Sequence, residues 1–157
     1  MCAFFVGDSM NYMEIAIKEA NKAYKKGDVP VGAIIIKNNK IIAKAYNTKE
    51  KNKNAINHAE ILVIKKACKK LNTWHLNDCI LYTTMEPCMM CCGAIMQSRI
   101  KEIHYILDNE SFGCLKLLGN INIIKENDDS YKNMINDFFI KLRSDNVSRE
   151  TLKKDKN

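Results

Sequence analysis

The chain of 157 residues is 46% hydrophobic and 27% charged and contains only two prolines and six glycines, a composition that excludes a disordered protein. Its length fits one domain, and no apolar run approaches the roughly 20 residues that span a bilayer, so a membrane-spanning role is excluded. The formal charge of +7 favours an anionic partner such as nucleic acid, although the codon bias of an AT-rich genome would produce a similar excess of lysine.

The first residues do not resemble a targeting signal. The opening MCAFFVG is too short for a secretory signal peptide and lacks its charged flank, so we expect a cytoplasmic protein. We interpret residues 1–9 either as an N-terminal extension or as the result of start-codon choice, since Met10 begins a better helix than Met1, and we assign them no role. In this setting the seven cysteines are expected to bind metal or to be buried, rather than to form a disulfide framework.

The first two predicted elements are a helix and a β-hairpin. Residues 9–27 place apolar side chains at helical spacing, with Ser9 as the expected N-cap and Gly27 at the end of the helix. In the following segment, VPVGAIIIKNNKIIAKAYN, two β-branched runs flank Asn38 and Asn39. Because asparagine tolerates positive φ, this pattern predicts a hairpin turn at that pair.

The rest of the chain alternates helices with short strands. Helical spacing, β-branched runs and a proline at a helix start define six further elements. They are a helix over 57–71, a strand over 79–84, a helix over 88–98, strands over 102–107 and 120–125, and a helix over 130–144 followed by a fraying basic tail over about 145–157. This order predicts one α/β domain over residues 1–157, a three-layer α/β/α arrangement around a mixed sheet of about five strands.

Three cysteines follow Pro87 in the stretch MEPCMMCCG and indicate a metal site. Cys88 and Cys91 lie three residues apart at a helix start, so both sulfurs share one face and the positive helix end favours their thiolates. Zinc takes four ligands, and His58, at the start of another helix, is the nearest credible third. Cys92 points about 100° away from Cys91 and is expected to be a buried spare, although a pairing of Cys88 with Cys92 stays open. Three protein ligands leave one position for water, which is the catalytic arrangement.

Glu60 lies two residues after His58 in the motif HAE. Residues i and i+2 do not face each other on a helix, so both reach one site only if it lies beyond the helix N-terminus. A carboxylate there that does not bind the metal can transfer protons during hydrolysis. For an isolated HAE motif, a glutamate that stabilises the first helical turn would be the simpler interpretation, and only the cysteine pair favours catalysis.

Together, HAE at 58–60 and PCMMC at 87–91 match the His-X-Glu and Pro-Cys-X-X-Cys signature of zinc nucleobase deaminases. Longer stretches, DVPVGAIIIKNNKIIAKAYN, LYTTMEPCMMCCGAIMQSRI and DFFIKLR, resemble the bacterial tRNA-specific adenosine deaminases from Met10 to about Arg143. The resemblance implies a cytidine deaminase-like fold, one Zn²⁺ per subunit and a homodimer. It also implies hydrolytic conversion of adenosine to inosine at the wobble position, in the anticodon loop of an arginine tRNA.

The resemblance also implies roles for individual residues. It makes His58, Cys88 and Cys91 the zinc ligands and Glu60 the residue that transfers protons. The residues that it implies for base binding are Asn47, which would hydrogen-bond the flipped base, and Val29 and Pro30, which would line the pocket. Without the family, Asn47 would be interpreted as a polar residue that ends a strand. The backbone amide of Ala59, at a helix start, is a further candidate for positioning the water or the substrate.

Basic residues gather in two stretches. Residues 37–53 contain six lysines and one acid, and residues 130–157 contain seven basic residues against four acids. An anticodon loop offers its base already unpaired, and phosphate contacts would add affinity, so these stretches are the expected RNA footprint. Within DFFIKLR the candidates for RNA contact are Phe139, Lys141 and Arg143, and we expect at least one of the two phenylalanines to pack in the core.

One loop departs from the family pattern. Family members carry Asp-Pro-Lys and then small, glycine-rich residues after the strand that corresponds to EIHYIL, whereas this chain has DNESFGCLKLLGN. RNA recognition around residues 108–113 therefore cannot be inferred from the resemblance. Two other functions stay open, namely deamination of a free base or nucleotide (cytidine, deoxycytidylate or guanine) and a non-catalytic, zinc-stabilised RNA-binding partner subunit.

Overall fold

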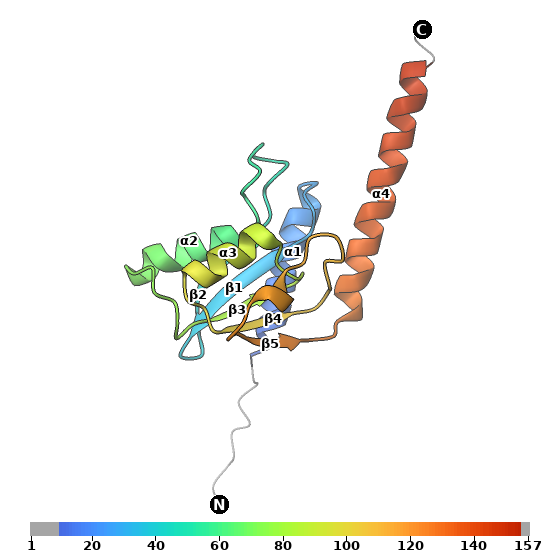
Figure 1. Ribbon diagram of the computed structural model, residues 1–157. Coiled ribbons are helices and arrows are strands. Elements are labelled where there is room, and N and C mark those ends of the chain that lie inside the picture. The colour runs from blue at the N-terminus through green and yellow to red at the C-terminus, as the bar shows by residue number, and fades with distance from the viewer. Residues whose placement is uncertain (1–9, 155–157) are drawn as a thin grey trace, which may run out of the picture.

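The computed structural model describes residues 10–154 and shows one five-stranded sheet with helices on both faces (Figure 1). Its elements are α1 (Tyr12–Lys25), β1 (Gly32–Lys37), β2 (Lys40–Tyr46), α2 (Ala59–Leu71), β3 (Ile80–Thr83), α3 (Met89–Gln97), β4 (Glu102–Tyr105), the short 3-10 helix η1 (Leu115–Leu117), β5 (Asn122–Lys125) and α4 (Asp129–Lys154). The predicted order of helices and strands is confirmed, and η1 is an addition. Within the described residues, no helix has the length and hydrophobicity that crossing a membrane requires.

The sheet is mixed, with the strand order β2-β1-β3-β4-β5. Strand β1 pairs antiparallel with both β2 and β3, whereas β3, β4 and β5 run parallel. The carboxyl ends of β2, β3 and β4 and the beginning of β1 therefore meet at one edge of the sheet. Because backbone and side chains that leave the strands converge there, this edge is where a site can form.

The apolar run of β1 is buried on both faces, as expected for a central strand. Ala33 and Ile35 pack in a core beneath α2 and α3, and Ile34 and Ile36 pack in a second core beneath α1 and α4. The alternation of side chains along a strand explains this division. The predicted three-layer α/β/α architecture is confirmed.

Local capping differs in one respect from the prediction. The N-cap of α1 is Asn11, whose Oδ1 accepts a hydrogen bond of 3.2 Å from the backbone N–H of Glu14. The predicted cap, Ser9, lies outside the described residues, and either residue type can cap a helix, so composition alone could not choose between them. The hairpin turn lies at Asn38 and Asn39, as predicted, with φ of 49° and 58°.

Helix α4 is longer than predicted. It continues to Lys154, past residue 145 where we expected fraying, and its second half projects away from the sheet (Figure 1). Residues 145–154 contain no glycine or proline, so nothing in them stops a helix. At the other end, Tyr131 is fully buried and its hydroxyl donates a 3.0 Å hydrogen bond to the carbonyl oxygen of Pro30. This contact joins α4 to the segment that precedes β1.

The two adjacent phenylalanines of α4 separate as expected. Phe138 is 9% exposed and packs edge-on against Tyr24 of α1, whereas Phe139 is 36% exposed. Lys141 also reaches Tyr24, and its ammonium group lies 4.9 Å from the ring centroid. The contact between α1 and α4 is therefore aromatic in its buried part and basic in its exposed part.

Candidate active site

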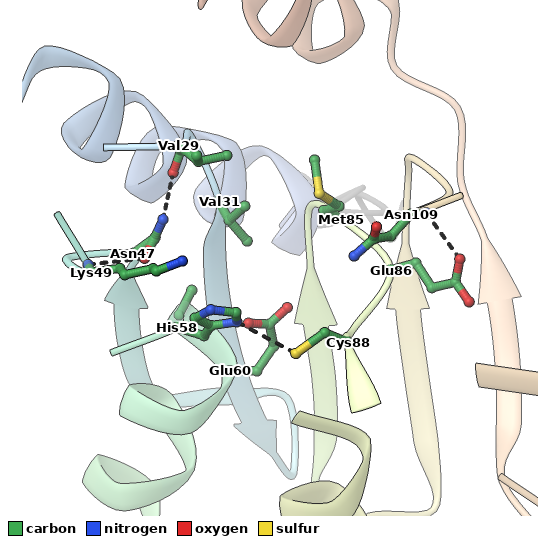
Figure 2. Close-up of a pocket in the computed structure, with 11 residues that line it drawn as sticks. Val29, Val31, Asn47, Lys49, His58, Glu60, Met85, Glu86, Cys88 and Asn109 are labelled. Atoms are coloured by element: carbon green, nitrogen blue, oxygen red, sulfur yellow. Dashed lines mark hydrogen bonds between the residues drawn. The ribbon is translucent and has the colours of Figure 1, made fainter. Parts of the chain in front are cut away.

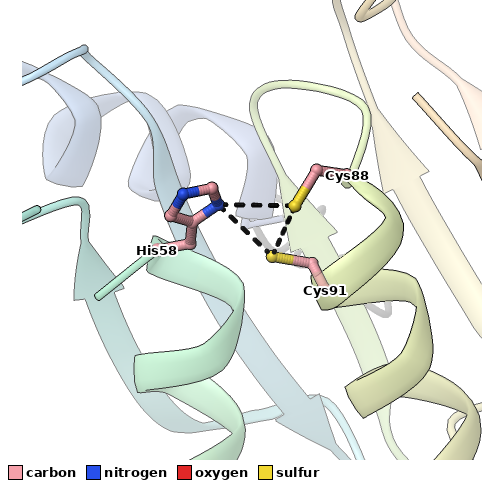
Figure 3. Close-up of side chains that lie close together, drawn as sticks. All are labelled: His58, Cys88 and Cys91. Atoms are coloured by element: carbon pink, nitrogen blue, oxygen red, sulfur yellow. Dashed lines mark hydrogen bonds between the residues drawn. The ribbon is translucent and has the colours of Figure 1, made fainter. Parts of the chain in front are cut away.

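Two helix starts bring three potential metal ligands together at the edge of the sheet. His58 is the N-cap of α2, Cys88 is the N-cap of α3, and Cys91 lies in the first turn of α3. The Nδ1 atom of His58 lies 3.6 Å from each cysteine Sγ, and the two Sγ atoms lie 3.6 Å apart (Figure 3). No other group of three or more His, Cys, Asp or Glu residues with this spacing occurs among the side chains that the structure describes, those of residues 10–149.

The spacing of these three atoms fits a tetrahedral ion. Bonds of about 2.3 Å to sulfur and about 2.0–2.1 Å to nitrogen place the ligands of tetrahedral zinc about 3.6–3.8 Å from one another. The observed triangle, with 3.6 Å on each side, has this size. The sequence therefore folds into a ligand set that could hold a metal ion, with one vertex not supplied by these three side chains.

The third cysteine of this region takes no part in the triangle. Cys92 is buried in the core beneath α2 and α3, and its Sγ lies 3.6 Å from the carbonyl oxygen of Pro87. Burial raises the pKa of its thiol to about 12, so it does not present a thiolate. The expectation that Cys92 is a buried spare is confirmed, and the alternative pairing of Cys88 with Cys92 is not what the structure contains.

The ligand triangle also has the electrostatics of a metal site. The sulfurs of Cys88 and Cys91 share a hydrogen bond of 3.6 Å, and this bond, with His58 nearby, lowers the pKa of Cys88 to about 3. The same hydrogen bond, together with burial, raises the pKa of Cys91. Cys88 is therefore a thiolate at neutral pH, and Cys91 keeps a proton that a bound metal would displace.

Glu60 lies beside the triangle in a buried position and is 3% exposed. Its Oε1 accepts a 3.1 Å hydrogen bond from the hydroxyl of Thr83, and its Oε2 lies 3.5 Å from the Sγ of Cys91. Burial raises the pKa of this carboxyl group above its ordinary value. The structure thus brings Glu60 next to the three potential ligands, while His58, Cys88 and Cys91 alone form the triangle.

A cavity of about 180 Å³ opens in front of these groups (Figure 2). The side chains around it come from the sheet edge described above and from the starts of α2 and α3. They are Val29, Val31, Asn47, Lys49, His58, Ala59, Glu60, Met85, Glu86, Cys88 and Asn109. The predicted residues Val29, Asn47, Ala59 and Glu60 thus share one cavity with two of the predicted ligands.

Pro30 is placed differently from the prediction. Val29 and Val31 line the cavity, but Pro30 does not, and its carbonyl oxygen instead accepts the hydroxyl of Tyr131. The backbone N–H of Val31 donates a 2.8 Å hydrogen bond to the carbonyl oxygen of Val29, so the chain makes a tight three-residue turn centred on Pro30. Val31 therefore lines the cavity, although the resemblance to the family did not assign it a role.

Asn47 stands at the cavity wall and is 7% exposed. Its Nδ2 donates a 3.1 Å hydrogen bond to the carbonyl oxygen of Val29, and its Oδ1 accepts one of 3.1 Å from the backbone N–H of Lys49. These bonds fix the amide plane. An asparagine amide can make more than two hydrogen bonds, so one N–H and one oxygen lone pair stay available to a ligand.

Several wall residues were missed by the sequence analysis. Met85 and Glu86 belong to the MEPC stretch but carry no signal of their own, because one apolar and one acidic residue before a helix are common. Asn109 belongs to the loop that departs from the family pattern. Met85 and Glu86 follow β3 and Asn109 follows β4, so these residues reach the cavity only because the strands pair in the sheet. Sequence spacing alone does not bring them near His58.

The candidates for RNA contact lie outside the cavity. Phe139, Lys141 and Arg143 are exposed on α4, and none of them lines the cavity wall. The lysine-rich loop after β2 is nearer, because Lys49 is itself a wall residue. Asp28, fully buried, holds that loop by accepting hydrogen bonds of 2.6 Å and 3.1 Å from the backbone N–H groups of Glu50 and Lys51.

Comparison with known proteins agrees with this arrangement. A family model described as MafB19-like deaminase matches residues 7–143, so the fold and the site define a deaminase. Two curated relatives narrow the class. The tRNA-specific adenosine deaminase of Bacillus subtilis is 47% identical over 110 residues, covering 70% of this chain and 68% of the relative. That of Aquifex aeolicus is 39% identical over 146 residues, covering 85% of this chain and 95% of the relative. The chain belongs to the tRNA-specific adenosine deaminase family.

Solved structures show the same fold. One comes from a study of A-to-I editing by tRNA:A34 deaminases at the wobble position; it is 30% identical, has a TM-score of 0.69, and the match covers 73% of this chain and 96% of that one. The guanine deaminase of Bacillus subtilis is 36% identical with a TM-score of 0.62, and the match covers 72% of this chain and 73% of that one. The predicted cytidine deaminase-like α/β fold is confirmed.

Proposed function

We propose that this protein hydrolyses adenosine to inosine and ammonia at the wobble position of a tRNA anticodon loop, with an arginine tRNA as the substrate. The observation that carries the proposal is the buried Glu60 carboxylate beside the triangle of His58, Cys88 and Cys91, inside a cavity of about 180 Å³. Membership of the tRNA-specific adenosine deaminase family supports the choice of substrate.

One Zn²⁺ per subunit would be held by His58 Nδ1 and the sulfurs of Cys88 and Cys91, whose spacing suits this ion. When bound, zinc acts as a Lewis acid that makes water acidic enough to provide a nucleophile at neutral pH. Two thiolates balance the charge of the ion, so Glu60 is not drawn into the ligand set and stays available to accept a proton.

Glu60 would carry the protons of the reaction. Its carboxylate accepts one proton from the attacking water and passes it to the ring nitrogen beside the carbon that bears the amino group. The second proton of the water goes by the same carboxylate to the departing amine, which leaves as ammonia. The Thr83 hydroxyl holds Oε1 in place at 3.1 Å, so the carboxylate keeps its direction through these transfers.

The rest of the cavity would hold the base. Val29, Val31 and Met85 provide apolar walls against which the two faces of a purine can pack, and Asn47 can hydrogen-bond its edge. The backbone N–H of Ala59 belongs to the first turn of α2, where the helix itself provides no acceptor, so it can position the water or the substrate.

The RNA would be held by basic groups around the cavity. Lys49 stands at the wall, and Lys141 and Arg143 lie exposed on α4 beside the half-exposed Phe139. Lysine and arginine can neutralise phosphates, and an exposed aromatic ring can stack on a base. Met89 is 71% exposed on α3, and we assign this apolar face to a homodimer contact in a cytoplasmic enzyme.

Deamination of a free base is the second candidate, because the guanine deaminase of Bacillus subtilis shares the fold at 36% identity. The deciding experiment offers the purified zinc-loaded protein an anticodon stem-loop, free adenosine, cytidine, deoxycytidylate and guanine, and measures each product by mass spectrometry. Inosine at the wobble position of the stem-loop, with little turnover of the free compounds, is the expected result. Turnover confined to free compounds would favour the second candidate.

The non-catalytic alternative makes a different prediction. A partner subunit that only binds RNA would have no use for a buried, oriented carboxylate such as Glu60, since burying one without a function costs free energy. If the protein binds the stem-loop and retains zinc but produces no inosine, and Glu60→Gln changes neither property, this alternative would replace the proposed function.

A further inference from the structure

The loop that departs from the family pattern contributes one side chain to the cavity, Asn109. Along the sheet edge the wall residues follow the strand order: Asn47 after β2, Val31 before β1, Met85 after β3 and Asn109 after β4. Asn47 and Asn109 therefore stand at opposite ends of the row, and Figure 2 shows the two amides on either side of the valine and methionine walls.

Glu86 fixes the position of this loop. Its carboxylate accepts hydrogen bonds of 3.0 Å from the backbone N–H of Asn109 and 3.2 Å from that of Leu115. The N–H of Gly113 closes the loop with a 2.7 Å bond to the carbonyl oxygen of Asn109. A Cβ at Gly113 would lie 2.3 Å from Glu86 Oε2, so only glycine lets the loop approach this carboxylate. The backbone of Asn109 is thus held by two hydrogen bonds, one through its N–H and one through its carbonyl oxygen.

The hydrogen bonds of Asn109 also decide which end of its amide faces the cavity. Its Oδ1 accepts a 3.1 Å hydrogen bond from the backbone N–H of Phe112, so the oxygen stabilises the turn of the loop. Its Nδ2 has no partner among the described residues and is free to donate. Asn47 likewise has its oxygen bonded to Lys49 and one N–H unused. Both ends of the cavity therefore offer an amide donor.

Two donors at opposite ends match a purine. With the amino-bearing carbon directed to Glu60 and the ligand triangle, an adenine presents N7 on one edge and N3 on the other, and both are acceptors. A pyrimidine ring has no second ring-nitrogen acceptor at the far edge. The pair of amides would therefore recognise the bicyclic ring in addition to the group that reacts.

We propose that Asn109 determines specificity by donating a hydrogen bond from Nδ2 to the purine ring nitrogen, N3 or N7, on the edge opposite Asn47, and that Glu86 is a positioning residue that holds it there. The inference rests on the proposed function and adds to it the contact made by the divergent loop.

The test pairs a change in the enzyme with a change of one substrate atom. Wild type and Asn109→Asp are compared on anticodon stem-loops that carry adenosine, 3-deazaadenosine or 7-deazaadenosine at the target position. Aspartate keeps an oxygen for the Phe112 N–H but lacks the donor. We expect kcat/KM on adenosine to fall by about tenfold, the scale of one lost hydrogen bond with added repulsion. On one of the two deaza substrates, the variant and wild type should differ by less than about twofold.

Two further variants distinguish the loss of a substrate contact from a loss of folding. Glu86→Gln, which can no longer accept both N–H groups with oxygens, should lower kcat/KM on adenosine and again lose its effect on the same deaza substrate. Ser111→Ala, an exposed change in the same loop, is the matched control and should retain wild-type kcat/KM. Thermal unfolding and zinc content, measured for all variants, report whether the fold is retained.

Each outcome has a clear consequence. An equal loss on all three stem-loops, or no loss for Asn109→Asp on adenosine, would overturn the inference while leaving the proposed function in place. A wild-type protein that produces no inosine in the unmodified stem-loop would overturn the proposed function and this inference with it. Coupling to one ring nitrogen only, shared by the variants at 86 and 109, is the result that supports it.

Discussion

The hydroxyl of Thr83 donates a 3.1 Å hydrogen bond to Oε1 of Glu60, and both side chains are buried. Replacing Thr83 by valine keeps the shape but leaves this oxygen without its donor. Because Glu60 must point into the cavity to transfer protons, we expect kcat on the stem-loop to fall by about tenfold with KM nearly unchanged. Steady-state kinetics will check this, and Thr83→Ser should restore most of kcat. A change confined to KM would contradict a positioning role.

Removing the carboxylate itself should have a larger effect. In Glu60→Gln the side chain keeps its size but cannot accept and release protons, and loss of general acid–base catalysis typically costs about 10²–10⁴-fold. Because Glu60 is outside the ligand triangle, zinc content measured by elemental analysis should stay at one ion per subunit. Near-normal formation of inosine by this variant would show that another group transfers the protons.

The metal site allows a comparison between adjacent cysteines. Cys91→Ser should lose most of its zinc, since one of the three sulfur and nitrogen atoms of the triangle is removed, whereas Cys92→Ser should retain it because Cys92 lies in the core. Zinc content and thermal unfolding in the presence and absence of a chelator measure both effects. The chelator should lower the melting temperature of wild type and change that of Cys91→Ser much less. Equal zinc loss in the two variants would reopen the ligand assignment.

How far the sequence predicted this structure depends on the range of the interactions involved. The proximity of His58, Cys88 and Cys91 could be predicted because the Cys-X-X-Cys spacing places two sulfurs on one face of a helix start and a metal would need a further ligand from another segment. Cys92 could be set aside on helical geometry alone. The orientation of Pro30 was not predicted, because it depends on the tight turn between Val29 and Val31 and on a hydrogen bond from Tyr131, which is distant in sequence.

The remaining features depend on contacts between distant segments. The turn of loop 108–113 is held by backbone N–H groups that bond Glu86, and backbone groups leave no pattern in a sequence. The length of α4 was underestimated because a charged, weakly amphipathic tail resembles a frayed end when its neighbours are unknown. The position of Asn109 in the cavity depends on both strand order and that loop.

The exposed basic groups of α4 should contribute to RNA binding through charge. Lys141→Gln and Arg143→Gln should each raise KM for the stem-loop while leaving kcat nearly unchanged. Each neutralised contact should also reduce the slope of log affinity against log salt by about 0.7–0.9. Binding measured over a salt series checks this, with Lys101→Gln, an exposed lysine before β4, as the control. An unchanged salt slope would remove α4 from the RNA footprint.

The start of α4 offers a test of stability against pH. Asp128 precedes the helix, and its Oδ1 accepts hydrogen bonds of 2.6 Å from the Ser130 hydroxyl and 2.9 Å from the backbone N–H of Tyr131. The Ser130 hydroxyl, followed by the backbone N–H groups, holds the pKa of this carboxyl below its ordinary value. Asp128→Ala removes the cap and should lower the free energy of unfolding by about 1 kcal/mol.

Asp128→Asn keeps an oxygen for the cap but not the charge. At neutral pH the wild type should be more stable than this variant by about 0.3–1 kcal/mol, the scale of a carboxylate at a helix N-terminus. Because the folded pKa of Asp128 is lowered, this advantage is present above the unfolded pKa of about 3.9 and is lost as pH falls through the folded value. Urea unfolding of both proteins at several pH values isolates the effect, since zinc release in acid affects both equally. A stability difference that does not change with pH would show that the charge of Asp128 does not contribute to anchoring α4.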